Sequence, residues 1–87
     1  MSLERVIKAL IGLGLSRSDA EVYVYLAKKG PQKVVHLSKA LIYNKQKINT
    51  SLRNLQTKGL VTTANTTFHA LPFKEALELL IETEKEQ

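Results

Sequence analysis

The sequence has no cysteine and no tryptophan among its 87 residues, and it has only two prolines and two histidines. Without cysteine, disulfide bonds and thiolate metal sites are excluded. The two histidines, His36 and His69, lie far apart with no cluster of carboxylates beside them, so no metal site is expected. No glycine-rich phosphate loop and no set of nucleophile, base and orienting acid is present, so neither a cofactor nor enzymatic catalysis is expected.

Long apolar runs are missing as well. No run approaches the roughly 18 residues that a membrane-spanning helix needs. The first five residues carry an acid, Glu4, and lack the pattern of a cleaved signal peptide. The sequence therefore predicts a cytoplasmic protein with no membrane partner. The apolar fraction of 44% suits one folded domain over residues 1–87.

Acidic residues are absent from the middle of the chain. Between Pro31 and Lys58 there is no Asp or Glu, whereas the segment carries Lys33, Lys39, Lys45, Lys47, Arg53 and Lys58. From Phe73 onward the balance reverses, because Lys74 and Lys85 stand against Glu75, Glu78, Glu82, Glu84 and Glu86. A basic middle and an acidic end indicate a polyanionic partner for the middle, with a merely solvated face as the alternative.

Helical spacing of apolar residues predicts two helices in the first third of the chain. The first covers about residues 3–12, and the Gly12–Leu15 segment forms a turn after it. The second begins after Ser16 as the N-cap, with Asp19 in the acidic position of a capping box, and ends at Gly30-Pro31. Its predicted core positions are Ala20, Tyr23, Leu26 and Ala27.

Two further helices are predicted in the acid-free segment. A short one runs from residue 34 or 35 to 41 and is expected to bury Val34, Leu37, Ala40 and Leu41. After a turn at Ile42-Tyr43, Asn44 is a good N-cap for a helix that continues to Lys58 and stops at Gly59. This fourth helix has only a narrow apolar stripe, formed by Ile48, Leu52 and Leu55.

The rest of the chain predicts a β-hairpin and a last helix. Residues 60–64 and 67–71 are rich in β-branched and aromatic types and flank Asn65-Thr66. Pro72 then opens a helix over about 73–86 whose apolar face holds Phe73, Ala76, Leu77, Leu80 and Ile81. The predicted fold class is mainly α with a small β-hairpin, in the order α-α-α-α-β-β-α. This is the plan of a winged helix-turn-helix domain, with the helix-turn-helix at about 34–58 and the wing at about 60–71.

The fourth helix is the candidate site, because in this plan the second helix of the pair enters the major groove of double-stranded DNA. Its stripe points inward, and none of its outward side chains is acidic. They are Lys45, Gln46, Lys47, Asn49, Thr50, Arg53, Asn54 and Lys58. Lys33, near the start of the third helix, is a further candidate phosphate contact. Tyr43 can bind a phosphate or pack under the turn, and both alternatives stay open.

Two stretches also resemble the TrmB-type transcriptional regulators of archaea and bacteria. The first stretch contains Leu13-Gly14-Leu15-Ser16, Asp19-Ala20-Glu21-Val22-Tyr23, Leu26 and Gly30-Pro31, and the second contains Lys47-Ile48, Leu52-Arg53, Leu55 and Lys58-Gly59-Leu60-Val61. The resemblance implies DNA binding through residues 45–58, usually by a dimer. Such regulators commonly carry a large sugar-sensing domain after the winged helix. This chain ends too soon for one, so no small-molecule effector is expected, and the uncharged 64–67 turn departs from the basic wing of the family.

The predicted function is therefore a transcriptional regulator that binds double-stranded DNA as a homodimer, which implies association with the nucleoid. The first or the last helix is expected to supply the dimer interface, for which the candidates are Leu3, Ile7, Leu10, Phe73, Leu77, Leu80 and Ile81. Two alternatives remain. One is a winged helix that binds other proteins within a larger assembly, and the other is a protein that coats the chromosome without sequence preference.

Overall fold

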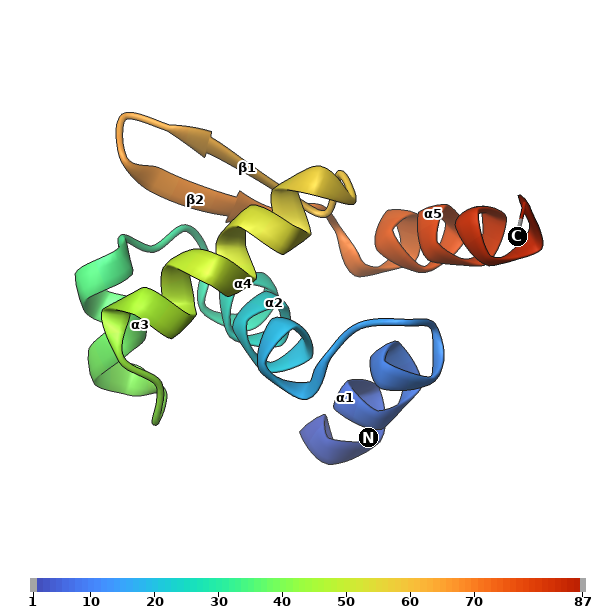
Figure 1. Cartoon of the computed structure of the whole chain (residues 1–87), viewed down its shortest axis with the longest axis horizontal. Helices are drawn as coiled ribbons and strands as arrows, with labels where there is room; N and C mark the ends of the chain where they lie inside the picture. Colours follow the sequence, from blue (N-terminus) through green and yellow to red (C-terminus); the bar gives the residue numbers. More distant parts are fainter. Residues whose placement is uncertain (1, 87) are drawn as a thin grey trace.

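The computed structural model describes residues 2–86, with side chains over residues 2–83. This part of the chain holds five helices and one antiparallel hairpin, in the order that the sequence predicts (Figure 1). The elements are α1 (Leu3–Gly12), α2 (Arg17–Lys29), α3 (Val34–Ala40), α4 (Lys45–Thr57), β1 (Val61–Ala64), β2 (Thr67–Ala70) and α5 (Phe73–Glu86). The mainly helical winged helix-turn-helix fold is thus confirmed. None of these helices combines the length and the apolar character that crossing a membrane requires.

Short polar side chains start the two helices that matter most for the site. Ser16 accepts a hydrogen bond from the backbone N–H of Asp19 at 3.1 Å, and Asn44 accepts one from the backbone N–H of Lys47 at 2.8 Å. Each bond satisfies one of the amide donors that a helix start leaves without a partner. The sequence predicted both caps. By contrast, α3 has Lys33 at its N-cap position and no side-chain cap.

The central helix, α2, is buried more widely than its periodicity predicted. It packs against α1, α4 and β2, and Val22 and Val24 are therefore buried together with Tyr23 and Leu26. The prediction was wrong for Ala27, which is exposed. It was also wrong in α3, where Ala40 is exposed and only Leu37 is fully buried, because this short helix packs one side onto α4.

The hydroxyl of Tyr23 ties the core to the end of the hairpin by donating a hydrogen bond to the backbone carbonyl of Leu71. The Tyr23 side chain is fully buried, and burial raises its pKa from 10 to about 12, because the charged phenolate is poorly solvated there. The neutral phenol is therefore the form that the fold stabilises.

This pKa shift predicts a loss of stability at alkaline pH. The contribution is fully present below pH 10, the pKa in the unfolded chain, and is lost as the pH rises to about 12. The free energy of unfolding should fall by about 2–3 kcal/mol over that window from this group alone. Tyr23→Phe removes the titrating group, so urea titrations of both proteins from pH 8 to pH 12 should show a shallower decline for the variant. A parallel decline would contradict the assignment.

The wing is a two-stranded hairpin in which Val61 pairs with Ala70 and Ala64 pairs with Thr67. A third segment joins its edge, because the backbone N–H of Gln32 donates to the Phe68 carbonyl at 3.1 Å and the N–H of Phe68 donates back at 2.8 Å. The segment that precedes α3 is thereby fastened to the wing. Since α3 leads directly into α4, the helix pair and the wing are held together.

The turn of the hairpin stores backbone strain. Asn65 and Thr66 both have positive φ angles, 52° and 64°, as a two-residue turn between right-twisted strands requires. Asparagine tolerates this region, whereas a β-branched threonine does so at a cost.

Thr66→Gly is therefore expected to stabilise the domain. Relief of the strain exceeds the extra chain entropy that glycine adds to the unfolded state, and we expect a net gain of about 1 kcal/mol. Thermal unfolding measures the change. The matched control is Thr63→Gly, which places the same substitution on the extended strand β1 and should lower the melting temperature. If both variants lose stability equally, the turn is not strained.

Candidate nucleic-acid interface

Helix α4 lies across α2 with one face in the core and the other facing solvent (Figure 1). The buried face consists of Ile48, Ser51, Leu52 and Leu55, so the predicted three-residue stripe is confirmed and Ser51 widens it. A small side chain at position 51 allows the two helices to approach closely. The orientation of the outer face is thus set by the packing of α4 on α2, α3 and β1.

The outer face of α4 carries amides, hydroxyls and cations. Lys45, Gln46, Lys47, Asn49, Thr50, Arg53, Asn54 and Lys58 are all exposed, as predicted, and no acid occurs in the helix. The ion pairs among the described side chains, residues 2–83, involve only Arg17 with Glu4 and Glu21. The four cations of this face are therefore available to an anionic ligand.

The centre of this face follows from the helical repeat of 100° per residue, counted from the buried Ile48. Thr57, Gln46 and Thr50 point most directly outward, and Arg53 lies beside them. The hydroxyl of Thr50 donates to the Gln46 carbonyl at 3.1 Å, and that of Thr57 donates to the Arg53 carbonyl at 3.0 Å. These bonds hold the two threonine side chains on the helix surface, so the long side chains of Gln46 and Arg53 reach furthest from it.

Sequence reasoning missed Gln56 and Thr57, both of which are exposed on α4. The helical spacing contains the signal, since Thr57 follows Arg53 by four residues and Thr50 by seven, and these intervals place all three on one side. The two residues extend the polar surface to the last turn of the helix.

Asn54 lies at one edge of the exposed face of α4, and its side chain contacts α2. Its side-chain nitrogen lies 3.4 Å from Oδ2 of Asp19, a carboxylate at the start of α2 that is only 4% exposed. The other carboxylate oxygen, Oδ1, has no hydrogen-bond partner among the described residues. Asn54 therefore has a fixed orientation, with its amide nitrogen turned toward α2.

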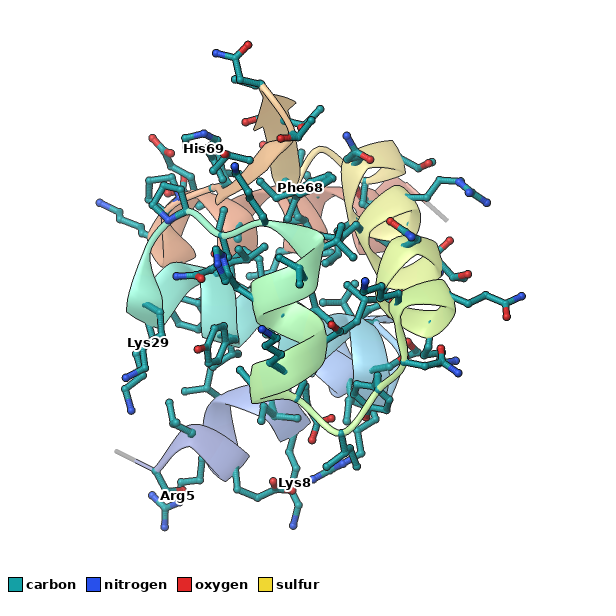
Figure 2. All side chains as sticks on the ribbon, turned by 90° about the vertical axis from the view of Figure 1, so that its left-hand side faces the viewer. Arg5, Lys8, Lys29, Phe68 and His69 are labelled. Carbon is teal, nitrogen blue, oxygen red and sulfur yellow. The ribbon has the colours of Figure 1, made fainter. Side chains whose placement is uncertain are left out.

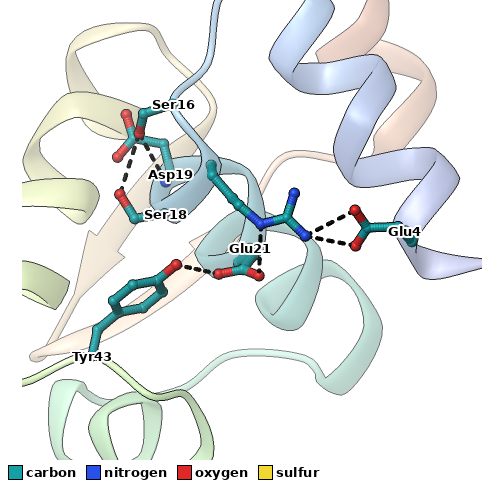
Figure 3. A network of polar contacts seen from close by, with 7 residues as sticks. Glu4, Ser16, Ser18, Asp19, Glu21 and Tyr43 are labelled. Carbon is teal, nitrogen blue, oxygen red and sulfur yellow. Dashed lines mark hydrogen bonds and ion pairs between the residues drawn. The ribbon is translucent and has the colours of Figure 1, made fainter.

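Tyr43, in the turn before α4, belongs to a polar network that joins three parts of the fold (Figure 3). Its hydroxyl donates to Glu21, and this hydrogen bond raises the pKa of Tyr43. Arg17 lies 3.6 Å from Glu21 and 2.7 Å from Glu4, and its hydrogen bonds lower the pKa of the Glu4 carboxyl. The Tyr43 hydroxyl thus has a carboxylate partner within the chain, and its contact with a phosphate stays a prediction.

Lys33 is exposed beside the wing. Together with Val34, Thr63, Asn65, Thr66 and Phe68 it lines a shallow groove of about 610 Å³ between α3 and the hairpin. The exposed side chains of the wing are uncharged, as predicted, and include Thr62, Thr63, Asn65 and Thr66. Lys33 therefore supplies the positive charge on this flank of α4.

The seven candidates for a dimer interface divide into two groups. Ile7, Leu10 and Leu80 are buried within the chain itself, so we withdraw them from the candidate surface. They fill the core because α1 packs on α2 and because Ala76 and Leu80 of α5 belong to the same buried cluster. Leu3, Phe73 and Ile81 are 45%, 36% and 43% exposed, and Leu77 is half-buried. These four remain available to a partner.

The described residues contain no group of three or more His, Cys, Asp or Glu side chains that could hold a metal ion. Helix α5, whose sequence is rich in acids, lies at the opposite end of the molecule from α3 (Figure 1).

Comparison with known proteins agrees with this geometry. Residues 10–74 match the family described as the sugar-specific transcriptional regulator TrmB. Among solved structures, the chain is similar to TrmBL2, an archaeal chromatin protein whose structure is said to show a novel mode of DNA binding. The TM-score is 0.88 at 23% sequence identity, over 99% of this chain and 35% of TrmBL2. The chain thus spans about a third of the length of TrmBL2, and no curated protein sequence matches it. The match over most of its length shows that the chain belongs to the TrmB family.

Proposed function

We propose that the chain binds double-stranded DNA as a transcriptional regulator, with α4 in the major groove. One observation carries this proposal: the outer face of α4, with its C-cap Lys58, is free of acids and exposes four cations and four amides, while the opposite face of the helix packs on α2. The major groove of B-DNA is wide enough for one helix. Membership of a family of transcriptional regulators supports the same conclusion.

The exposed residues of α4 contact different parts of the DNA according to their chemistry. Lys45, Lys47 and Lys58 neutralise phosphates and supply most of the affinity. Gln46 and Arg53 reach furthest outward and contact base edges, where glutamine suits adenine and arginine suits guanine. Lys33 adds a phosphate contact from the flank beside the wing.

A homodimer places two copies of α4 in successive major grooves. The spacing between the two helices is then about 34 Å, one turn of the duplex. The operator of such a dimer is a pair of half-sites related by two-fold symmetry. Pairing also buries apolar side chains that a chain of this size otherwise exposes, including Phe73 and Ile81.

The salt dependence of binding tests the proposal. Four lysines assigned to phosphates, Lys33, Lys45, Lys47 and Lys58, predict that log K falls with log[salt] with a slope of about −3 to −4 per protomer, a loss of about a hundredfold from about 50 to about 200 mM KCl. Fluorescence anisotropy with a labelled duplex measures the slope. An affinity that does not change with salt would overturn DNA binding through this face.

A second candidate function is sequence-independent coating of the chromosome. The uncharged wing favours it, since fewer specific contacts are then available, and the similar structure belongs to a chromatin protein. Selection of bound duplexes from a random pool separates the two functions. A regulator enriches a half-site motif, whereas a coating protein leaves the pool unchanged.

A further inference from the structure

A carboxylate lies buried behind one edge of the exposed face of α4. Asp19, in the first turn of α2, is only 4% exposed, and its backbone N–H donates to the Ser16 hydroxyl at 3.1 Å (Figure 3). Oδ2 of Asp19 lies 3.4 Å from the side-chain nitrogen of Asn54, and Oδ1 has no hydrogen-bond partner among the described residues. The carboxylate is therefore held at the contact of α2 with α4, where it reaches a residue of the candidate nucleic-acid interface.

The helix start alone does not explain why Asp19 is buried. Burial of the carboxylate costs free energy, because one amide group replaces the water that would otherwise solvate both oxygens. The N-terminus of α2 offsets part of this cost, since a helix start favours a negative side chain. An exposed acid in the same turn would supply that contribution without the cost of burial. The direction of the Asn54 amide, by contrast, depends on a carboxylate at this place.

An asparagine amide has a donor end and an acceptor end, and a carboxylate binds only the donor end. Because the nitrogen of Asn54 is turned toward Asp19, its oxygen is turned away from α2 and toward solvent. Asn54 precedes Thr57 by three residues, so it lies about 60° to one side of the centre of the exposed face of α4. The chain thus presents a hydrogen-bond acceptor of fixed direction within the surface that the proposed function turns toward DNA.

We propose that Asp19 is a positioning residue for base recognition: it holds the Asn54 oxygen toward the DNA, where this oxygen accepts a hydrogen bond from the exocyclic amine of adenine or cytosine. The inference rests on the proposed function, the binding of α4 in the major groove. In that groove adenine and cytosine present an amine donor, whereas guanine and thymine present oxygen acceptors. Asp19 thereby restricts an amide that can either donate or accept to one that favours adenine or cytosine at one position of each half-site.

Selection of bound duplexes from a random pool tests the inference with the full chain. The wild-type chain should enrich adenine or cytosine at one half-site position, and Asn54→Ala should lose the preference at that position alone. Asp19→Asn replaces the carboxylate with a group of nearly the same shape that both donates and accepts. The Asn54 nitrogen is then free to turn outward, so discrimination against guanine and thymine at this position should fall about tenfold.

An exchange of the two groups supplies a rescue. Asp19→Asn/Asn54→Asp returns an acceptor to the outer position, because the amide at position 19 can donate to the carboxylate at position 54. This variant should recover the preference for adenine or cytosine, with a lower overall affinity, since the negative charge now lies nearer to the phosphates. A residue that only stabilises the fold would change the affinity for all duplexes alike and would not move the preference at one position.

Two controls accompany the selection. Asn49→Ala removes an exposed amide from the other edge of α4 and should leave the position read by Asn54 unchanged. Asp19→Asn removes no cation, so its salt slope should equal that of the wild-type chain. Circular dichroism shows whether each variant is folded. If Asp19→Asn does not fold, Asn54→Ala decides the case, because Asn54 is exposed and its truncation leaves the core intact.

Two outcomes would overturn the role of Asp19. The first is a selected motif in which no preference for adenine or cytosine is lost in Asn54→Ala, and a pool that selection leaves unchanged counts as this outcome. The second is a folded Asp19→Asn protein that selects the same motif as the wild-type chain. Neither outcome alters the salt dependence of binding, which tests the DNA contact of α4 by itself, so the two proposals fail separately.

Discussion

Replacing Leu52 with alanine is expected to lower the free energy of unfolding by about 3–5 kcal/mol, because it leaves a cavity between α4 and α2. The side chain is 1% exposed and lies at the middle of the buried face of α4. Small domains have a total stability of about 5–15 kcal/mol, so the loss is a large fraction of what holds this chain folded.

Urea unfolding of the two proteins measures the difference. Ile42→Ala serves as the control, because it removes an aliphatic side chain of similar size from an exposed position and should change the free energy by less than about 0.5 kcal/mol. Equal effects at positions 42 and 52 would mean that α4 is not seated on α2 as the structure shows.

The second large effect concerns DNA affinity. Lys45→Gln/Lys47→Gln/Arg53→Gln removes the three cations of α4 without altering its buried face. We expect the affinity for duplex DNA to fall at least about a hundredfold, and the salt slope to fall by about two, because Lys45 and Lys47 are the phosphate contacts among the three. Arg53→Ala alone should cost about 1–3 kcal/mol if Arg53 contacts a base.

The control for charge is Arg5→Gln/Lys8→Gln/Lys74→Gln, which also removes three cations but from α1 and α5. Arg5 and Lys8 lie on α1, away from the exposed face of α4 (Figure 2). Anisotropy titrations should show a much smaller loss for this variant. If both triple variants bind equally weakly, the attraction is a property of the net charge of +5 and not of the α4 face.

Much of the fold could be predicted from local patterns. Ser16 and Asn44 mark helix starts because their side chains accept from a backbone amide three residues on, an interaction that depends on adjacent residues alone. The stripe of Ile48, Leu52 and Leu55 likewise gives the inner face of α4, and its outer face follows from the helical repeat. The order of the helices and strands and the absence of acids from the candidate surface also follow from patterns among neighbouring residues.

Contacts between segments that are distant in the sequence could not be predicted from local patterns. Ala27 sits at a core-like interval in α2 yet is exposed, whereas Val22 and Val24 are buried because other elements cover those sides. The engagement of Tyr43 by Glu21 joins residues 22 positions apart, and the contact of Asn54 with Asp19 spans 35 positions. Ile7, Leu10 and Leu80 have the same apolar character as Leu3 and Ile81, and only packing separates buried from exposed.

The sequence by itself determined which segments become helix or strand and which side of α4 carries cations, because periodicity, caps and charge are properties of neighbouring residues. Only the tertiary structure decided which apolar side chains stay available to a partner and which polar groups are already engaged. The exposure of an apolar side chain and the partner of a polar group depend on which other segments of the folded chain pack against that residue.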